Sequence, residues 1–164
     1  MSHNSFSQKE QGVTLVELLA AITITTLIGL IAYSVLFSGF KTYERVKAED
    51  AIRDEADVIM VQLISSLYTE KEADITKKVL NDNESGNSYL EFNGGEQTGF
   101  YNGLIYIKGE AISVLQSDDI ILHKDSKMNE VDQGQYEIIL ALEHVPSGRK
   151  MVTQSEVSLI RSSD

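Results

Sequence analysis

A single carboxylate stands in the most apolar stretch of this chain. Within residues 13–40, Glu17 is the only Asp or Glu, and the stretch contains no Lys or Arg. A charged side chain in a membrane helix costs about 2.5–3.5 kcal/mol at the bilayer centre and less near an end, so it is usually retained where it has a partner. Glu17 would also interact favourably with the dipole of a helix N-terminus. Its position therefore predicts an interaction with a positively charged group.

The apolar stretch has a sharp N-terminal boundary. The residues before it, MSHNSFSQKEQG, are polar and end in Gly12, and the apolar residues begin at Val13. A secretory signal has an apolar stretch of only about 7–15 residues, followed by its cleavage site. The stretch here is longer, and about 20 apolar residues in a helix are enough to cross a bilayer. The sequence therefore predicts a membrane anchor.

Gly12, Val13 and Glu17 together resemble the prepilin signature of type IV pilins and of the pseudopilins of type II secretion. The resemblance implies that a prepilin peptidase removes residues 1–12 as a leader by cutting between Gly12 and Val13. It further implies that the new N-terminus at Val13 is methylated and that Glu17 contacts a neighbouring subunit during assembly. The resemblance covers residues 8–45 strongly and the rest only by architecture. Val13 stands where Phe is usual, and no proline interrupts the first helix, which favours a minor pilin or pseudopilin.

Partners and a location follow from the same resemblance. The expected partners are other pilin or pseudopilin subunits, the prepilin peptidase, the assembly platform of the inner membrane and the lipid bilayer. The expected topology is a single pass through the cytoplasmic membrane, with the leader in the cytoplasm and the globular region outside it. The mature form would lie in a filament of the cell envelope or surface. Secretion, competence and adhesion machines all remain open.

The charges that follow the apolar stretch point to the opposite orientation. Lys41, Arg45 and Lys47 would keep that side in the cytoplasm under the positive-inside rule. Glu44 and Glu49 are interleaved with them, so we give the cleavage signature more weight. The alternative function is a membrane-anchored extracytoplasmic ligand-binding module with an uncleaved signal anchor, and an intact N-terminus would distinguish it.

The remaining sequence predicts a long helix followed by an antiparallel sheet. Residues 41–70 contain no Gly or Pro and carry apolar residues at spacings of three and four, which extends the helix from about residue 13 to 70 with an amphipathic second half. Residues 71–164 then contain a turn-rich linker and short alternating runs typical of strands. The predicted class is α+β, with the amphipathic half of the helix packed on the sheet, as in pilins. The helix stripe comprises Ile52, Ala56, Ile59, Leu63 and Leu67, widened by Met60 and Ile64, and the runs cover residues 89–92, 104–108, 111–116, 120–123, 135–144 and 150–160.

Composition argues against other functions. The net charge of -11 argues against broad nucleic-acid binding, which needs Lys and Arg in excess on some face. The absence of Cys excludes disulfides, thiolate nucleophiles and Cys-type zinc sites. His123 and His144 lack a catalytic or metal-binding spacing, and the acidic loop at residues 82–86 lacks the spacing of a calcium loop. We therefore expect no enzyme activity, cofactor or metal.

Overall fold

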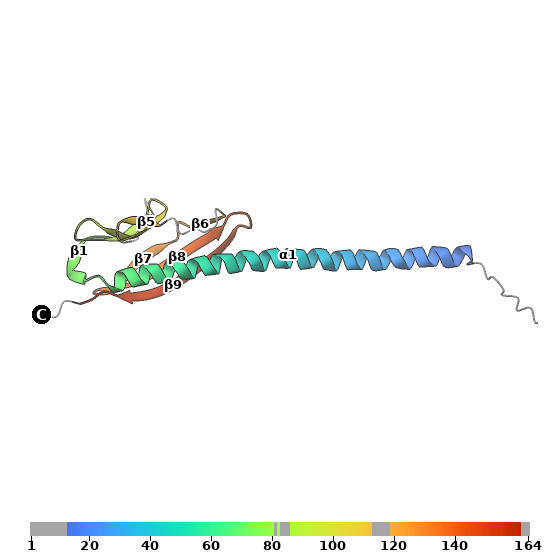
Figure 1. Cartoon of the computed structure of the whole chain (residues 1–164), viewed down its shortest axis with the longest axis horizontal. Helices are drawn as coiled ribbons and strands as arrows, with labels where there is room; N and C mark the ends of the chain where they lie inside the picture. The colour runs from blue at the N-terminus through green and yellow to red at the C-terminus, as the bar shows by residue number, and fades with distance from the viewer. Residues whose placement is uncertain (1–12, 81, 83–85, 113–118, 162–164) are drawn as a thin grey trace, which may run out of the picture. The chain divides into compact units, whose positions relative to one another are not determined.

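The computed structural model describes residues 13–80, 82, 86–112 and 119–161. The chain divides into two compact units, Met1–Glu44 and Arg45–Asp164. Helix α1 (Leu15–Tyr68) extends through the division, and all the strands belong to the second unit (Figure 1). A short 3₁₀ helix, Glu72–Asp74, follows α1, and the strands are β1 (Ile75–Val79), β2 (Ser88–Phe92), β3 (Gln97–Tyr101), β4 (Leu104–Ile107), β5 (Glu110–Ile112), β6 (Ile120–Leu122), β7 (Lys127–Asp132), β8 (Gln135–His144) and β9 (Arg149–Ser158).

In the first unit, α1 exposes its whole surface. Every residue from 13 to 44 is exposed, and large side chains such as Leu15 and Phe37 are 78% and 51% exposed. By length and composition this helix could cross a membrane. The hydroxyls of Thr23, Thr25 and Thr26 each donate to the carbonyl four residues earlier at 2.8 Å. These hydroxyls are therefore satisfied inside the helix and need no water.

In the second unit, α1 buries the predicted apolar stripe. Ile59, Leu63 and Leu67 have no exposed surface, and they share one hydrophobic core with residues of both sheets. Burying such a side chain contributes about 1.5–3 kcal/mol. The helix ends at Tyr68, directly after the last residue of the stripe, and Lys71 beyond it is extended. The predicted helix and its amphipathic second half are confirmed.

The strands form two antiparallel sheets. The first, which we call the meander sheet, contains β1 to β5 in sequence order. In the second, the β8 sheet, β9 pairs along the whole of β8, while β7 and β6 pair with successive parts of its other side. Tyr136, Ile138, Leu140 and Leu142 alternate along β8 and have no exposed surface. The predicted antiparallel sheet and its buried face are thus confirmed, with the strands divided between two sheets.

Turn residues explain two of the hairpins. Lys108 and Gly109 connect β4 to β5, and both have positive φ, 52° and 81°. Positive φ at both positions is the type I′ geometry that matches the twist of a two-residue hairpin. Residues 145–148 connect β8 to β9 and end in Gly148, with φ 62°. Each turn lies between two runs that the sequence predicted as strands, although the first begins at Lys108, which the prediction had assigned to the run 104–108.

Two serine hydroxyls fill gaps in the strand pairing. Ser88 of β2 accepts a hydrogen bond from the Met128 N–H of β7 at 2.7 Å, and its hydroxyl donates to the Met128 carbonyl at 3.1 Å. Ser126 does the same for the main chain of Ala141, at 2.9 and 3.0 Å. The Ser88 hydroxyl therefore links β2 of one sheet to β7 of the other. The Ser126 hydroxyl bonds to the main chain of β8 at Ala141, between the parts of β8 that pair with β6 and with β7.

Gly99 of β3 provides a test of how tightly this join is packed. A Cβ on Gly99 would lie 2.5 Å from the Ser88 carbonyl oxygen and 3.0 Å from Met128 Sδ, and φ is 136°. We expect Gly99→Ala to lower the free energy of unfolding by about 2–5 kcal/mol. Gly103→Ala is the matched control, because φ is 74° but no atom lies within 4 Å, and we expect a loss of about 1–2 kcal/mol. Urea unfolding of the full chain in detergent measures both; equal losses would contradict the packing argument.

Candidate functional site

The first turn of α1 places Glu17 against Thr14. The Thr14 N–H and hydroxyl both donate to Glu17 Oε2, at 2.9 and 3.0 Å, and the Glu17 N–H donates to Thr14 Oγ1 at 3.3 Å. This reciprocal pattern is a capping box, in which Thr14 is the N-cap and Glu17 the third helical residue. It satisfies main-chain N–H groups that have no partner within the helix.

The capping box is a role that our reading of the sequence missed. The signal was present in the sequence, because Thr14 followed three residues later by Glu17, ahead of an apolar run, is the pattern of a capping box. Val13 lies directly before the helix and is 73% exposed. Gly12 lies outside the described residues, so the structure does not test the predicted cleavage position.

The geometry leaves one oxygen of Glu17 available. Both bonds from Thr14 go to Oε2, and within the described part of the chain Oε1 accepts no hydrogen bond. An ionised carboxylate can accept several hydrogen bonds, and those from an ammonium group are among the strongest. The first turn of α1 can therefore hold a positively charged group while its own cap remains intact.

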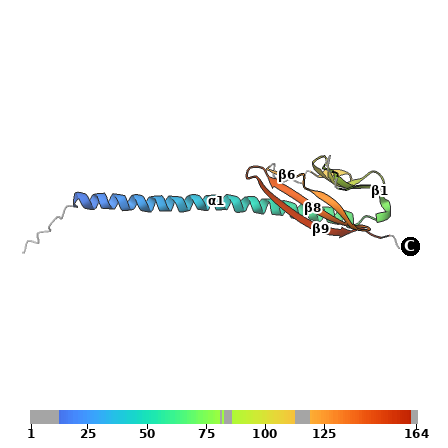
Figure 2. The same cartoon turned by 180° about the vertical axis from the view of Figure 1, so that it is seen from behind.

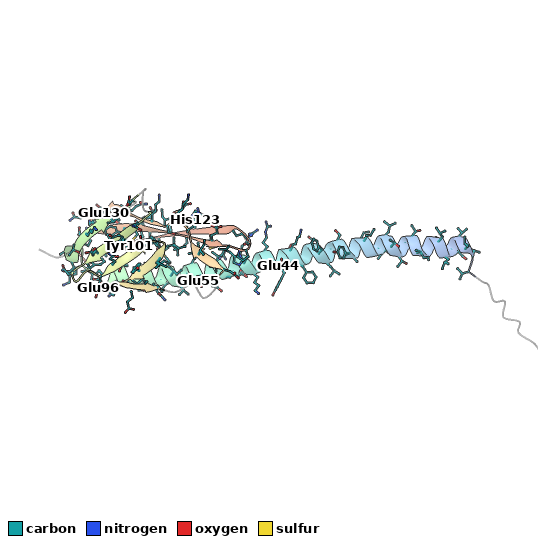
Figure 3. All side chains as sticks on the ribbon, turned by 90° about the horizontal axis from the view of Figure 1, so that it is seen from above. Glu44, Glu55, Glu96, Tyr101, His123 and Glu130 are labelled. Atoms are coloured by element: carbon teal, nitrogen blue, oxygen red, sulfur yellow. The ribbon has the colours of Figure 1, made fainter. Side chains whose placement is uncertain are left out.

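His123, which is labelled in Figure 3, belongs to a different kind of site, a cluster of charged groups. His123 Nδ1 lies 3.4 Å from an oxygen of Asp125 and accepts a hydrogen bond from the Asp125 N–H at 3.2 Å. Lys150 forms an ion pair with Asp125, and its hydrogen bond lowers the pKa of that carboxyl below the ordinary value. Asp125 is half-exposed, so this cluster contributes little to stability. Within the described part of the chain, His123 lies against the carboxylates of Asp125 and Glu143, and His144 contacts Ser147 within a turn.

A second charged cluster joins the two sheets. Lys78 of β1 donates to Glu130 of β7 at 2.7 Å, and the Tyr136 hydroxyl donates to the same Glu130 oxygen at 3.3 Å. The Lys78 ammonium also lies 5.5 Å from the centre of the Tyr136 ring. Burial raises the pKa of Tyr136. Burial disfavours the charge on Lys78, but its bonds to Glu130 and Tyr136 outweigh burial and raise its pKa.

Metal binding has no support in the described residues. No group of three or more His, Asp or Glu side chains in this part of the chain is arranged to hold an ion. Asp82 and Gly86 of the acidic loop are described, whereas residues 83–85 lie outside the described residues. Of the three residues predicted for cleavage, methylation and assembly, the structure describes Val13 and Glu17.

The fold defines an α+β protein of pilin-like architecture, whose N-terminal helix is long and apolar enough to cross a membrane. Residues 7–33 match the family described as the prokaryotic N-terminal methylation motif, which is the type IV prepilin signature. The match supports membership of the type IV pilin-like family, whose members are structural proteins, assemble with other pilin subunits and are processed by a peptidase. No curated protein and no solved structure matches the chain.

Lys78, Glu130 and Tyr136 form a group that we call the Lys78 cluster. From its pKa shifts we expect the protein to lose stability at alkaline pH. Because folding raises the pKa of both Tyr136 and Lys78, the native state holds these protons more tightly than the unfolded state. The contribution is fully present below about pH 10 and is lost as pH rises through the raised values. We expect Tyr136→Phe to make the fall in unfolding free energy above about pH 10 shallower, measured by urea unfolding. Tyr106→Phe, outside this cluster, is the control; an unchanged slope in Tyr136→Phe would contradict the assignment.

Proposed function

We propose that this chain is a minor pilin or pseudopilin, a structural subunit of a type IV pilus-like filament. The observation that carries the proposal is the methylation motif at residues 7–33 on a helix that exposes every apolar side chain in its first unit. An exposed surface of this kind requires lipid or other helices as its surroundings. In a filament, the N-terminal helices of neighbouring subunits would surround this surface in place of lipid.

Processing and assembly would use the same few residues. Cleavage between Gly12 and Val13 would release residues 1–12 and create an amine at Val13, which would then be methylated. That amine would pair with Glu17 of a neighbouring subunit, whose Oε1 is not used by the capping box. Pairing removes the cost of a lone carboxylate in an apolar environment, which explains why assembled subunits would be favoured over separate ones. Machines for secretion, DNA uptake and adhesion all fit this chemistry.

The N-terminal mass tests the processing step. We expect protein extracted from membranes of the host to begin at Val13 and to carry an added methyl group. Cells that lack the prepilin peptidase provide the control, and there the mass should include residues 1–12. If the protein from normal cells retained residues 1–12, the alternative of an uncleaved anchor with an extracytoplasmic ligand-binding domain would replace our proposal.

Glu17→Gln separates the charge of Glu17 from its role in the cap. Gln can also form a capping box with Thr14, so the helix start should persist, whereas the negative charge is lost. We expect both Glu17→Gln and Glu17→Ala to reduce incorporation into filaments at least about tenfold, while cleavage continues. The measurement is the ratio of sheared-filament protein to membrane protein on immunoblots. Normal incorporation of Glu17→Gln would show that Glu17 serves only as a helix cap.

A further inference from the structure

Strand β9 has the longest open edge among the described strands. It has ten residues and pairs in unbroken register with β8 from Arg149 to Ser158, and in the described part of the chain no other strand pairs with it (Figure 2). Its side chains alternate between half-buried and exposed until Val157, as expected of a strand covered on one face. The main-chain groups on its open side therefore form a ready template for another strand.

The other edges of the two sheets are protected, whereas β9 is not. Among the described strands, β5 and β6 have only three residues each. β1 has an irregular register and two lysines, Lys77 and Lys78. The pairing of β7 with β8 shifts register between Glu130 and Asp132, and the Ser88 hydroxyl is hydrogen-bonded to the N–H and the carbonyl of Met128. Short length, charge and bulges are the usual means of preventing strand addition.

The centre of β9 lacks these features. Residues 151–155, with the sequence MVTQS, contain no charge, proline or glycine, and Val152 is 54% exposed. We propose that the open edge of β9 binds an extended segment of another protein, which adds to the β8 sheet as an antiparallel strand. Main-chain hydrogen bonds would supply affinity, and side chains along the edge would supply specificity.

The charges at the two ends of β9 define the partner strand. Lys150 and Glu156 lie on the same exposed face of β9, with the uncharged segment between them. Lys150 is also paired with Asp125, and Glu156 accepts a hydrogen bond from Gln135 at 2.9 Å, so a partner strand would add to these contacts. A partner strand that places an acidic residue opposite Lys150 and a basic residue opposite Glu156 would form two favourable cross-strand pairs. The β9 sequence itself meets this requirement when two copies run antiparallel about Thr153. Lys150 of each strand then lies opposite Glu156 of the other, and Val152 lies opposite Gln154.

The natural occupant is nevertheless a different protein, a conclusion that rests on the proposed function. Copies of this chain that assemble side by side in a filament have the same orientation, so their β9 strands would run parallel. In-register parallel pairing would place Lys150 beside Lys150 and Glu156 beside Glu156, and like charges in facing positions are destabilising. The strand that fits best is uncharged over five residues, carries opposite charges at its ends and runs antiparallel to β9.

A synthetic peptide with the sequence of residues 149–158, blocked at both ends, is a probe with these properties. We expect it to bind the full chain in detergent with saturation, measured by fluorescence anisotropy of the labelled peptide. A peptide with Lys150→Glu should bind the natural chain about threefold to tenfold more weakly, because it places Glu opposite Glu156. The chain with Glu156→Lys should reverse this preference. That variant also places Lys opposite Glu137 of β8, so its fold should be retained.

Two further measurements test the geometry. A peptide methylated on alternate main-chain nitrogens along its pairing side cannot form the ladder, and its binding should be lost while its charges are unchanged. Because the chain has no cysteine, Gln154→Cys introduces a single thiol. It should form a disulfide with a peptide carrying Val152→Cys, which lies opposite it, and much less with Met151→Cys, which faces the other side.

The outcomes are distinct. Failure of the natural peptide to bind, equal binding of the methylated peptide, or no reversal by Glu156→Lys would overturn the β9 site. A dimer of the full chain through β9, displaced by the peptide, would show that the occupant is a second copy and would overturn the assignment to a different protein. None of these results depends on the N-terminal mass or on filament incorporation, so failure of this proposal is distinguishable from failure of the proposed function.

Discussion

The need to cover an exposed apolar helix is the constraint on which the rest of this protein depends. Every residue from 13 to 44 is exposed, and the large apolar side chains within this segment are at least 51% exposed. Each such side chain gains about 1.5–3 kcal/mol when it leaves water, so an isolated aqueous form of this unit is strongly disfavoured. A bilayer and a bundle of similar helices both meet the need. Movement from one to the other requires no change in the helix itself, since its threonine hydroxyls are already bonded internally.

The second unit covers the apolar side chains of its part of α1 with its own strands. Its part of α1 buries one stripe against the two sheets, and one core contains residues such as Leu63, Leu90 and Leu140. Ser88 and the Lys78 cluster connect the sheets by polar contacts whose groups are mutually satisfied. The dependence on outside partners is therefore concentrated in the exposed helix of the first unit and, by our proposal, at the edge of β9.

The sequence was most informative where one periodicity covered many residues. The helix, its buried stripe and the alternating face of β8 were predicted because burial on one side gives a repeat of about 3.6 or of 2. Strands β1, β3 and β7 were not predicted. Their sequences, ITKKV, QTGFY and KMNEVD, are short and partly charged or contain Gly, and long-range pairing rather than local preference makes them strands. The Ser88 join could not be predicted either, because it connects residues 40 positions apart.

At the candidate site, the sequence identified Glu17 but not its cap, and the cap changes how the carboxylate should be understood. A lone carboxylate would have to be desolvated at the moment of assembly, whereas the bonds from Thr14 already compensate one of its oxygens. The same bonds fix the side-chain conformation, so a neighbouring amine would lose less conformational entropy on pairing with it. Capping and assembly are therefore compatible roles of one side chain. In the proposed assembly, Thr14 would lower the cost of keeping Glu17 in the membrane and would hold its free oxygen ready for a partner.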